Sequence, residues 1–280
     1  MKVINNIKDL KQEINALKGS IGLVPTMGAL HEGHKSLIEK SVSENDNTVV
    51  SIFVNPIQFG ANEDLDKYPR TLDNDCELCK KAGVTIVFAP GPDEMYSDNK
   101  NNLTLICPPY CAVDKLCAKS RPGHFDGVCS VVAKLFNLTR AQRAYFGQKD
   151  AQQLFIVKKM VKDLNFNIEI IPCPIVREKD NLALSSRNKY LTQNERKLAL
   201  NISKSLFEAK KLFKEGTASK RAIIDNSLSL MKDLDVEYIE FVNYNTFEFQ
   251  NEIDENTLML IAAKTPESKT RLIDNTKLRD

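Results

Sequence analysis

The stretch from Gly22 to Ser41 reads G-L-V-P-T-M-G-A-L-H-E-G-H-K-S-L-I-E-K-S. Its apolar start is typical of a buried strand that stops at Pro25, and a helical pattern begins near Glu32. The sequence therefore predicts a strand, a tight glycine turn and a helix. Because the first turn of a helix has backbone N–H groups without intrahelical partners and carries the positive end of the helix dipole, this junction is a candidate anion site.

Two histidines, His31 and His34, stand three residues apart at this junction. This spacing puts them on nearly the same face of the first helical turn. They can donate hydrogen bonds to phosphate oxygens, while Gly28 and Gly33 let the backbone approach a ligand closely. The alternative is an ordinary strand–helix corner whose histidines cap the helix and pack. Taken alone, an H-x-G-H motif favours that alternative, because short motifs match by chance.

The composition is that of a globular protein without a strong charge bias. The 280 residues are 42% hydrophobic and 27% charged, with a formal net charge of +2, which suits one or two domains with a large core. The chain lacks the basic run of a nucleic-acid-binding protein and the roughly 20 consecutive apolar residues of a membrane span. The polar start M-K-V-I-N-N is unlike a signal peptide, so we expect a cytoplasmic protein.

The seven cysteines indicate reduced thiols rather than a disulfide framework, because their number is odd. Cys76 and Cys79 form a C-x-x-C pattern and are followed by Cys107 and Cys111, so a zinc site has to be considered. The first pair falls within a helical pattern, where small apolar residues usually face a core. We therefore expect these cysteines to pack rather than to bind a metal.

Strands and helices alternate in the first part of the chain. We predict strands at 21–24, 48–54, 84–89, 144–146 and 168–176, a further strand or edge segment at 103–107, and helices at 4–17, 33–44, 71–82, 128–136 and 154–164. Thr71 is the expected cap of helix 71–82, and Gly83 its end. This alternation is typical of an α/β fold with a doubly wound, mainly parallel sheet.

The pattern changes after Val176. Two long helices are predicted at 192–214 and 218–233, the first opened by a capping box of Thr192 and Glu195, and strands follow at 236–243, 257–263 and 270–274. Helices grouped before strands indicate a separate α+β domain. We therefore expect the domain boundary near Val176.

Several donor-rich turns in this fold suit a phosphate. Lys149 follows a predicted strand beside Gly147, Ser185-Ser186-Arg187 can clamp a phosphate from a lid segment, and Arg121 and His124 lie at a helix entrance. Gln58 and Gln153 lie just beyond such loops and suit a hydroxy acid. Each residue alone also fits an ordinary surface or capping role. Together they predict a polyphosphate nucleotide, in a chain without a P-loop or G-x-G-x-x-G motif.

Seven segments resemble the pantothenate synthetase (pantoate–β-alanine ligase) family. They are P-T-M-G-A-L-H-E-G-H (25–34), F-V-N-P-I-Q-F (53–59), Y-P-R-T (68–71), R-P-G-H-F-D-G-V (121–128), G-Q-K-D-A-Q-Q (147–153), L-S-S-R-N (184–188) and K-T-R-L-I-D-N (269–275). The segments occur in the family's order and span nearly the whole chain. The family commonly has Glu where Gln148 stands, Phe or Tyr where Ala151 stands, and Gly where Ala118 stands.

The resemblance implies a Rossmann-like nucleotidyltransferase domain over 1–175 that binds ATP and pantoate. It implies a smaller C-terminal α+β domain over 176–280 that closes over the site and takes part in a homodimer. The implied reaction of coenzyme A biosynthesis joins (R)-pantoate and β-alanine to pantothenate, with ATP converted to AMP and pyrophosphate through a pantoyl adenylate. Mg²⁺ is the implied cofactor, with Asp75 as a candidate ligand, and no nucleic-acid or membrane partner is expected.

The resemblance also implies the site. The catalytic residues are expected to be His31, His34, Lys149 and Arg187, with His34 as the proton donor. The implied ATP-binding residues are Met27, Gly28, Ala29, Leu30, His31, Glu32, Gly33, His34, Gly147, Gln148, Lys149, Asp150, Val176, Leu184, Ser185, Ser186 and Arg187. The expected pantoate and β-alanine site comprises Met27, Gln58, Arg121, His124 and Gln153.

Two other functions share some of these features. An adenylyltransferase of the same superfamily would have the H-x-G-H turn, but it would need neither the pair Gln58 and Gln153 nor the second domain. An RNA-binding module related to aminoacyl-tRNA synthetases would carry a basic surface, which the near-neutral charge disfavours.

Overall fold

The computed structural model describes residues 1–60, 65–96, 102–109, 112, 114–216 and 219–279. The chain forms two compact units, one made of residues 1–148 and 152–174 and the other of residues 149–151 and 175–280. Residues 149–151 thus group with the second unit, although the chain on both sides of them belongs to the first. No helix among the described residues is long and apolar enough to cross a bilayer.

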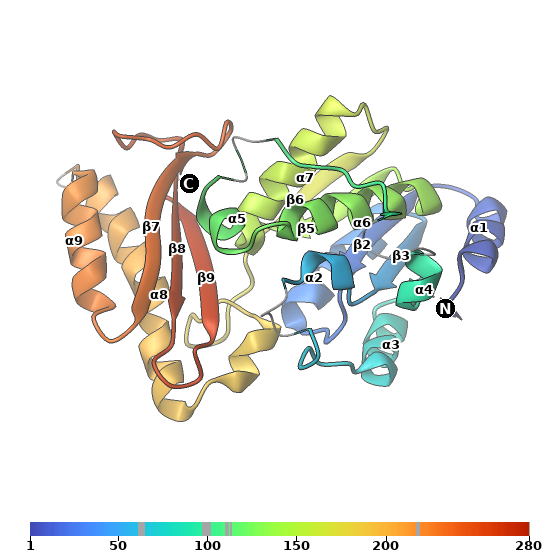
Figure 1. Ribbon diagram of the computed structural model, residues 1–280, viewed down its shortest axis with the longest axis horizontal. Helices are drawn as coiled ribbons and strands as arrows, with labels where there is room; N and C mark the ends of the chain where they lie inside the picture. Colours follow the sequence, from blue (N-terminus) through green and yellow to red (C-terminus); the bar gives the residue numbers. More distant parts are fainter. Residues whose placement is uncertain (61–64, 97–101, 110–111, 113, 217–218, 280) are drawn as a thin grey trace. The chain divides into compact units, whose positions relative to one another are not determined.

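The first unit contains a six-stranded sheet in the order β1-β4-β3-β2-β5-β6, and all its strand pairs are parallel. Figure 1 labels β2, β3, β5 and β6 of this sheet. The strands are β1 (Lys2–Ile4), β2 (Ile21–Thr26), β3 (Asn47–Ile52), β4 (Ile86–Phe88), β5 (Arg143–Gly147) and β6 (Glu169–Cys173). The helices are α1 (Ile7–Ala16), α2 (Glu32–Glu44), α3 (Leu72–Lys81), α4 (Pro92–Met95), α5 (Leu116–Ser120), α6 (His124–Thr139) and α7 (Ala151–Asp163), with the 3₁₀ turn η1 (Pro56–Gln58). A second 3₁₀ turn, η4 (Gln148–Asp150), precedes α7, and its last two residues and Ala151 of α7 group with the second unit. The predicted parallel α/β fold is confirmed.

Both faces of this sheet are buried, because successive strand residues point to opposite faces. Leu23 and Val49 belong to a core that also contains residues of α1, α6 and α7. Their neighbours Val24 and Val50 belong to a second core with residues of α2 and α3. Helices therefore cover both faces, as expected for a parallel sheet made of near-continuous apolar strands.

The strand order predicts that a ligand binds at the carboxyl edge of the sheet between β2 and β5. From β2 the chain adds β3 and β4 on one side and then β5 and β6 on the other, so the order reverses at the β2–β5 pair. Ligands of open α/β sheets bind outside the carboxyl ends of the strands at such a point. The turns that follow β2 and β5, at 27–31 and 148–150, carry the predicted phosphate-binding residues.

The second unit is an α+β arrangement, as predicted. An antiparallel sheet in the order β7-β8-β9 packs with two helices around a core of its own. Its elements are η5 (Ser186–Tyr190), α8 (Gln193–Lys214), α9 (Lys220–Leu230), β7 (Asp235–Asn243), β8 (Thr257–Lys264) and β9 (Arg271–Lys277). The predicted capping box of Thr192 and Glu195 opens α8. Residue 218 of the predicted second helix lies outside the described residues.

Two local predictions were wrong, and a third was right in the position of the residue but not in its hydrogen bond. The first residues form strand β1 rather than part of a helix from Ile4, because β1 pairs with β4 far along the chain. The described residues 103–107 form no strand. Thr71 stands at the cap position of α3 but makes no capping hydrogen bond there; its hydroxyl donates to Asp75 Oδ1 at 3.2 Å instead.

Candidate active site

The turn after β2 is held together by its own backbone N–H groups. The N–H of Gly28, with φ +82°, donates to Thr26 Oγ1 at 3.1 Å. The N–H groups of Ala29 and Leu30 donate to the two carboxylate oxygens of Asp75 at 2.9 and 2.8 Å. The prediction that this backbone offers unpartnered N–H groups to an anion was therefore wrong for these residues.

Asp75 has a structural role. It is 2% exposed, and both of its oxygens accept hydrogen bonds from the turn. An added Cβ at Gly28 would lie 3.0 Å from one of these oxygens, which explains why glycine stands there. A carboxylate used in this way is a poor Mg²⁺ ligand, and the described residues contain no cluster of three or more His, Cys, Asp or Glu side chains that could hold a metal.

The two histidines cap α2, as the alternative interpretation of the motif expected. His31 Nδ1 accepts from the N–H of Gly33 at 3.1 Å, and His34 Nδ1 accepts from the N–H of His31 at 3.4 Å. Capping does not exclude the chemical role, because a neutral ring that accepts at Nδ1 carries its proton on Nε2. The two rings lie 4.0 Å apart, centroid to centroid. The cap thus fixes two imidazoles in the tautomer that donates from Nε2.

The Gln58 side chain is oriented by Asn55. Asn55 is 1% exposed, and its Nδ2 donates to Gln58 Oε1 at 3.1 Å and to the carbonyl of Gly127 at 3.0 Å. Gln58 Nε2 then points at Met27 Sδ, 2.9 Å away. A thioether is a weak acceptor, so a carboxylate or hydroxyl oxygen of a ligand can take this donor instead. The polar pair Asn55 and Gln58 just after β3 indicated a ligand edge from the sequence, but only Gln58 was assigned to the site; the structure adds Asn55 as the residue that orients it.

Arg121 and His124 are linked to the same loop. His124 Nδ1 lies 2.8 Å from the Gln58 carbonyl, which can only accept, so Nδ1 is the donor. His124 Nε2 then accepts from Arg121 Nη1 at 2.9 Å. The structure thus brings Met27, Gln58, Arg121 and His124 together within the first unit.

The two glutamines after Ala151 differ in environment. Gln152 is 4% exposed; it accepts from the N–H of Cys117 at 3.0 Å and donates to the carbonyl of Ala112 at 2.7 Å. Gln153, the residue predicted to bind pantoate, is only half-buried. Gln152 is therefore structural, which its place in the Q-Q pair did not reveal.

The turn after β5 presents Lys149. Its side chain is 20% exposed, and Nζ lies 3.7 Å from Asp150 Oδ2. Its carbonyl accepts from Asn275 Nδ2 at 2.9 Å. An added Cβ at Gly147 would meet no atom within 4 Å, so the backbone is open on that side.

The remaining predicted ATP residues lie on one hairpin of the second unit. The N–H of Leu184 donates to the carbonyl of Val176 at 3.0 Å, and Arg177 pairs with Ala183 in an antiparallel bridge. Ser185 then caps η5 by accepting from the N–H of Arg187 at 3.3 Å. This hairpin therefore presents Ser185, Ser186 and Arg187 in consecutive positions, each partly exposed.

The C-x-x-C pair Cys76 and Cys79 packs, as expected, whereas Cys107 is exposed and the packing prediction was wrong for it. Cys79 is fully buried in the core between the sheet and helices α2 and α3, and the six described cysteines are free thiols. Cys111 of the considered zinc pattern lies outside the described residues.

Comparison with known proteins decides the family. Residues 2–277 match the family model described as pantoate-beta-alanine ligase. The chain belongs to the pantoate-beta-alanine ligase family. A family member from Clostridium novyi (strain NT), named pantothenate synthetase, is 51% identical over 98% of both chains. One of the same name from Helicobacter pylori (strain G27) is 49% identical over 98% of this chain and 99% of its own length.

Solved structures of the pantoate-beta-alanine ligase family share the fold. The structure from Thermus thermophilus has a TM-score of 0.93 at 38% identity and covers all of both chains. The structure from Francisella tularensis, solved in complex with β-γ ATP and β-alanine, has a TM-score of 0.83 at 36% identity and covers 99% of this chain and 98% of its own.

Proposed function

We propose that this chain joins (R)-pantoate to β-alanine with ATP as the second substrate, giving pantothenate, AMP and pyrophosphate. The observation that carries the proposal is the end-to-end match to pantoate-beta-alanine ligases. The relative from Francisella tularensis, crystallised with β-γ ATP and β-alanine, supports ATP and β-alanine as two of the substrates. The reaction is a step of pantothenate biosynthesis.

Activation of the acid is the first step. An amine cannot displace oxide from a carboxylate, so an oxygen of the pantoate carboxylate attacks the α-phosphorus of ATP in line. The bond from this phosphorus to the α–β bridging oxygen breaks, and pyrophosphate leaves with the electron pair. Pantoyl adenylate, a mixed anhydride, remains bound.

Donor side chains of the predicted ATP-binding residues stabilise the negative charge that develops on pyrophosphate. We assign this role to the Nε2–H groups of His31 and His34 and to the charges of Lys149 and Arg187, with the hydroxyls of Ser185 and Ser186 added. Donors aimed at developing charge are worth about 3–4 kcal/mol each in barrier height. The tautomers set by the helix cap favour the histidines for this task.

Amide formation is the second step. The neutral amine of β-alanine attacks the acyl carbon, the carbon–oxygen bond to AMP breaks, and the nitrogen loses a proton. Gln58 contacts pantoate and β-alanine through Nε2, and Gln153 holds pantoate. Pro25, Met27 and Phe59 offer apolar surface to the geminal methyl groups. The segment 184–188 acts as the gate that excludes water from the labile anhydride.

We propose that Mg²⁺ arrives on the nucleotide. Asp75 does not fit as its ligand, because both oxygens hold the turn after β2. Mg²⁺ is commonly bound through substrate phosphates and water, and when bound it neutralises phosphate charge.

We further propose domains at 1–175 and 176–280, a homodimer and a cytoplasmic location; the free thiols of the described cysteines support the location.

A purified-protein assay tests the function. ATP, pantoate and β-alanine are supplied together and then omitted one at a time. We expect pantothenate and AMP only with all three, and exchange of labelled pyrophosphate into ATP with pantoate alone. Exchange that strictly requires β-alanine would contradict the free adenylate, and a stable dinucleotide-like product would instead identify an adenylyltransferase.

A further inference from the structure

The proposed mechanism leaves the C-terminal motif K-T-R-L-I-D-N, 269–275, without a role. Its last two residues, Asp274 and Asn275, lie on β9 and are 4% and 5% exposed. Consecutive residues of a strand point to opposite faces, so these two buried polar side chains have different neighbours. One neighbour, Lys149, is a predicted ATP-binding residue, and the other, Arg177, adjoins the predicted residue Val176.

Asn275 holds the lysine turn. Its Nδ2 donates to the carbonyl of Lys149 at 2.9 Å, although the two residues are 126 positions apart in the chain. This contact lies within the second unit, because residues 149–151 group with that unit and not with the residues on either side. A fixed carbonyl limits the directions in which the Lys149 ammonium can point.

Asp274 holds the hairpin. Its carboxylate accepts from Arg177 Nη1 at 2.6 Å and from Nη2 at 2.9 Å, a bidentate pair in which the Arg177 and Asp274 side chains are 17% and 4% exposed. Arg177 stands next to Val176 at the base of the hairpin and pairs with Ala183. The hairpin leads directly into Ser185, so the ion pair anchors the base of the segment that ends at Arg187.

We propose that Asp274 and Asn275 are positioning residues for ATP, which hold the lysine turn and the hairpin in register from the middle of β9. The inference rests on the proposed function, because it takes Lys149 and Arg187 as phosphate ligands. In-line attack needs both cations at set distances from one triphosphate, and a displacement of about 1 Å can cost about 100-fold in rate. Two segments that stand apart in the sequence therefore need a common anchor.

The first test removes the amide of Asn275. In Asn275→Ala we expect kcat/KM for ATP, measured by pantoate-dependent pyrophosphate exchange, to fall at least about 10-fold, as a small displacement predicts. The KM for β-alanine in the complete reaction should not change. The matched control is Asn243→Ala in the same unit, which removes an amide that accepts from the N–H groups of Asn245 and Thr246 at 2.9 and 3.2 Å. We expect wild-type kinetics from this control.

A double-mutant cycle separates positioning from a merely structural role. If Asn275 acts through Lys149, Asn275→Ala should cost little more once Lys149→Ala is present, whereas two independent losses add. Additive losses would overturn the inference, and so would wild-type kinetics in a folded Asn275→Ala protein. If thermal unfolding shows that Asn275→Ala is not folded, the Asn275→Asp variant is used instead, because aspartate keeps the size of the side chain but lacks the N–H donor.

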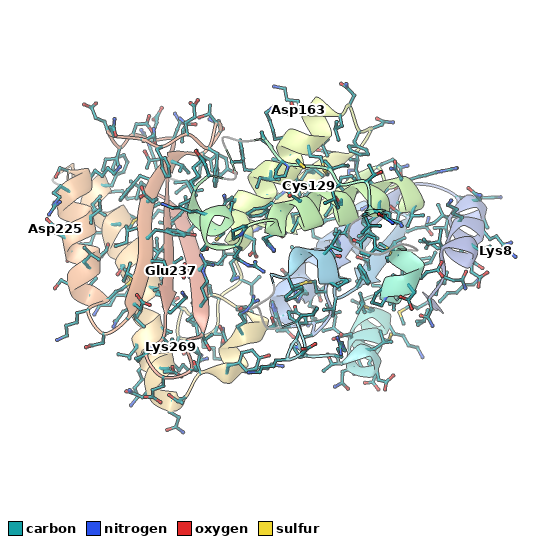
Figure 2. The ribbon with its side chains drawn as sticks, viewed as in Figure 1. Lys8, Cys129, Asp163, Asp225, Glu237 and Lys269 are labelled. Atoms are coloured by element: carbon teal, nitrogen blue, oxygen red, sulfur yellow. The ribbon has the colours of Figure 1, made fainter. Side chains whose placement is uncertain are left out.

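A second pair of variants tests the hairpin anchor. Arg177→Lys keeps the charge but loses the bidentate geometry, and we expect kcat/KM for ATP to fall. The control is Arg271→Lys on β9, the strand that carries Asp274. The Nε of Arg271 pairs with Glu237 at 2.8 Å, and Figure 2 labels Glu237 on β7. Equal effects of the two variants would overturn the anchor role. A wild-type protein that makes no pantothenate would instead overturn the proposed function, and the inference with it.

Discussion

At the scale of single residues, the site combines structural and chemical tasks in the same side chains. His31 and His34 cap α2 through Nδ1, and this fixes the Nε2 tautomer that we assign to phosphate. Asn55 fixes Gln58 in a similar way: its Nδ2 donates to the amide oxygen of Gln58, so the amide nitrogen of Gln58 points toward Met27. Donors fixed in this way need no reorganisation when charge develops in the transition state.

The His34→Ala variant tests this assignment. We expect turnover to fall about 100- to 1,000-fold, because one donor to the developing charge is lost. Loss of the cap should lower the free energy of unfolding by only about 1 kcal/mol. Asn6→Ala is the control, because Asn6 caps α1 by accepting from the N–H of Asp9 at 2.8 Å and has no assigned role in the reaction. Near-normal turnover in His34→Ala would remove its catalytic role.

At the scale of elements, α6 approaches the 3₁₀ turn η1 closely, and a glycine makes this approach possible. An added Cβ at Gly127 would lie 2.7 Å from the backbone N and Cα of Gln58. The same contact brings the Gly127 carbonyl to the amide of Asn55. Packing of α6 against η1 thereby fixes the position of the Gln58 backbone, from which its side chain extends.

Gly127→Ala should therefore disturb both stability and substrate binding. We expect the free energy of unfolding, from urea titration, to fall by about 1–3 kcal/mol through overpacking, and KM for pantoate to rise. Gly147→Ala serves as the control for stability alone, because an added Cβ there meets nothing within 4 Å. Equal stabilities of the two variants would contradict the close approach.

The start of α8 is tied to the loop before β9 by Glu195. This carboxylate is fully buried and accepts from the N–H groups of Thr192, Glu267 and Ser268. Burial alone would raise the pKa of Glu195, but hydrogen bonds from the backbone of Ser268 and Thr192 outweigh it and lower the pKa from 4.5 to about 2. The ionised form thus stabilises the fold.

A pH series on Glu195→Gln follows from this shift. Because the folded-state pKa is depressed, the stabilising contribution is fully present above about pH 4.5 and is lost as the pH falls toward 2. We expect the difference in unfolding free energy between wild type and variant to be largest near neutral pH and to shrink in acid. A difference that does not depend on pH would show that the carboxylate charge is not the cause.

At the scale of the whole molecule, two units with separate cores carry the predicted residues. Of the six described cysteines, Cys79, Cys129 and Cys173 are buried in the first unit, Cys76 and Cys117 are half-buried, and Cys107 is exposed. Cys129 lies on α6 (Figure 2). Burial is the first cause that raises the pKa of Cys79 and Cys129 to about 12 and that of Cys173 to about 11.

Thiol labelling with a disulfide reagent checks this distribution. Because the thiolate is the reactive form, we expect Cys79, Cys129 and Cys173 to react only when the protein unfolds. Cys107 should react at once, and Cys107→Ser should remove one thiol from the fast phase. Unfolded wild type should release seven equivalents. Fast labelling of the three buried thiols in the native protein would contradict their burial in the two cores of the first unit.

The sequence by itself determined the local elements and the fold class of this protein. Apolar periodicity located the strand and helix around His31, and the capping box at Thr192 marked the start of α8, because such signals depend on neighbours within about one turn. The motif segments also pointed to the family. Strand β1 escaped this reasoning, since its three residues become a strand only by pairing with β4.

Only the tertiary structure decided how the predicted site residues are held. Asp75 closes a turn 45 residues before it, and Asn275 reaches Lys149 across 126 positions. No local pattern encodes such contacts, because a buried polar group takes whatever partner the fold brings to it. For the same reason the sequence led to two wrong predictions: Asp75 as a metal ligand, and the turn after β2 as a site with unpartnered backbone N–H groups. In the structure the Asp75 carboxylate accepts hydrogen bonds from the N–H groups of that turn.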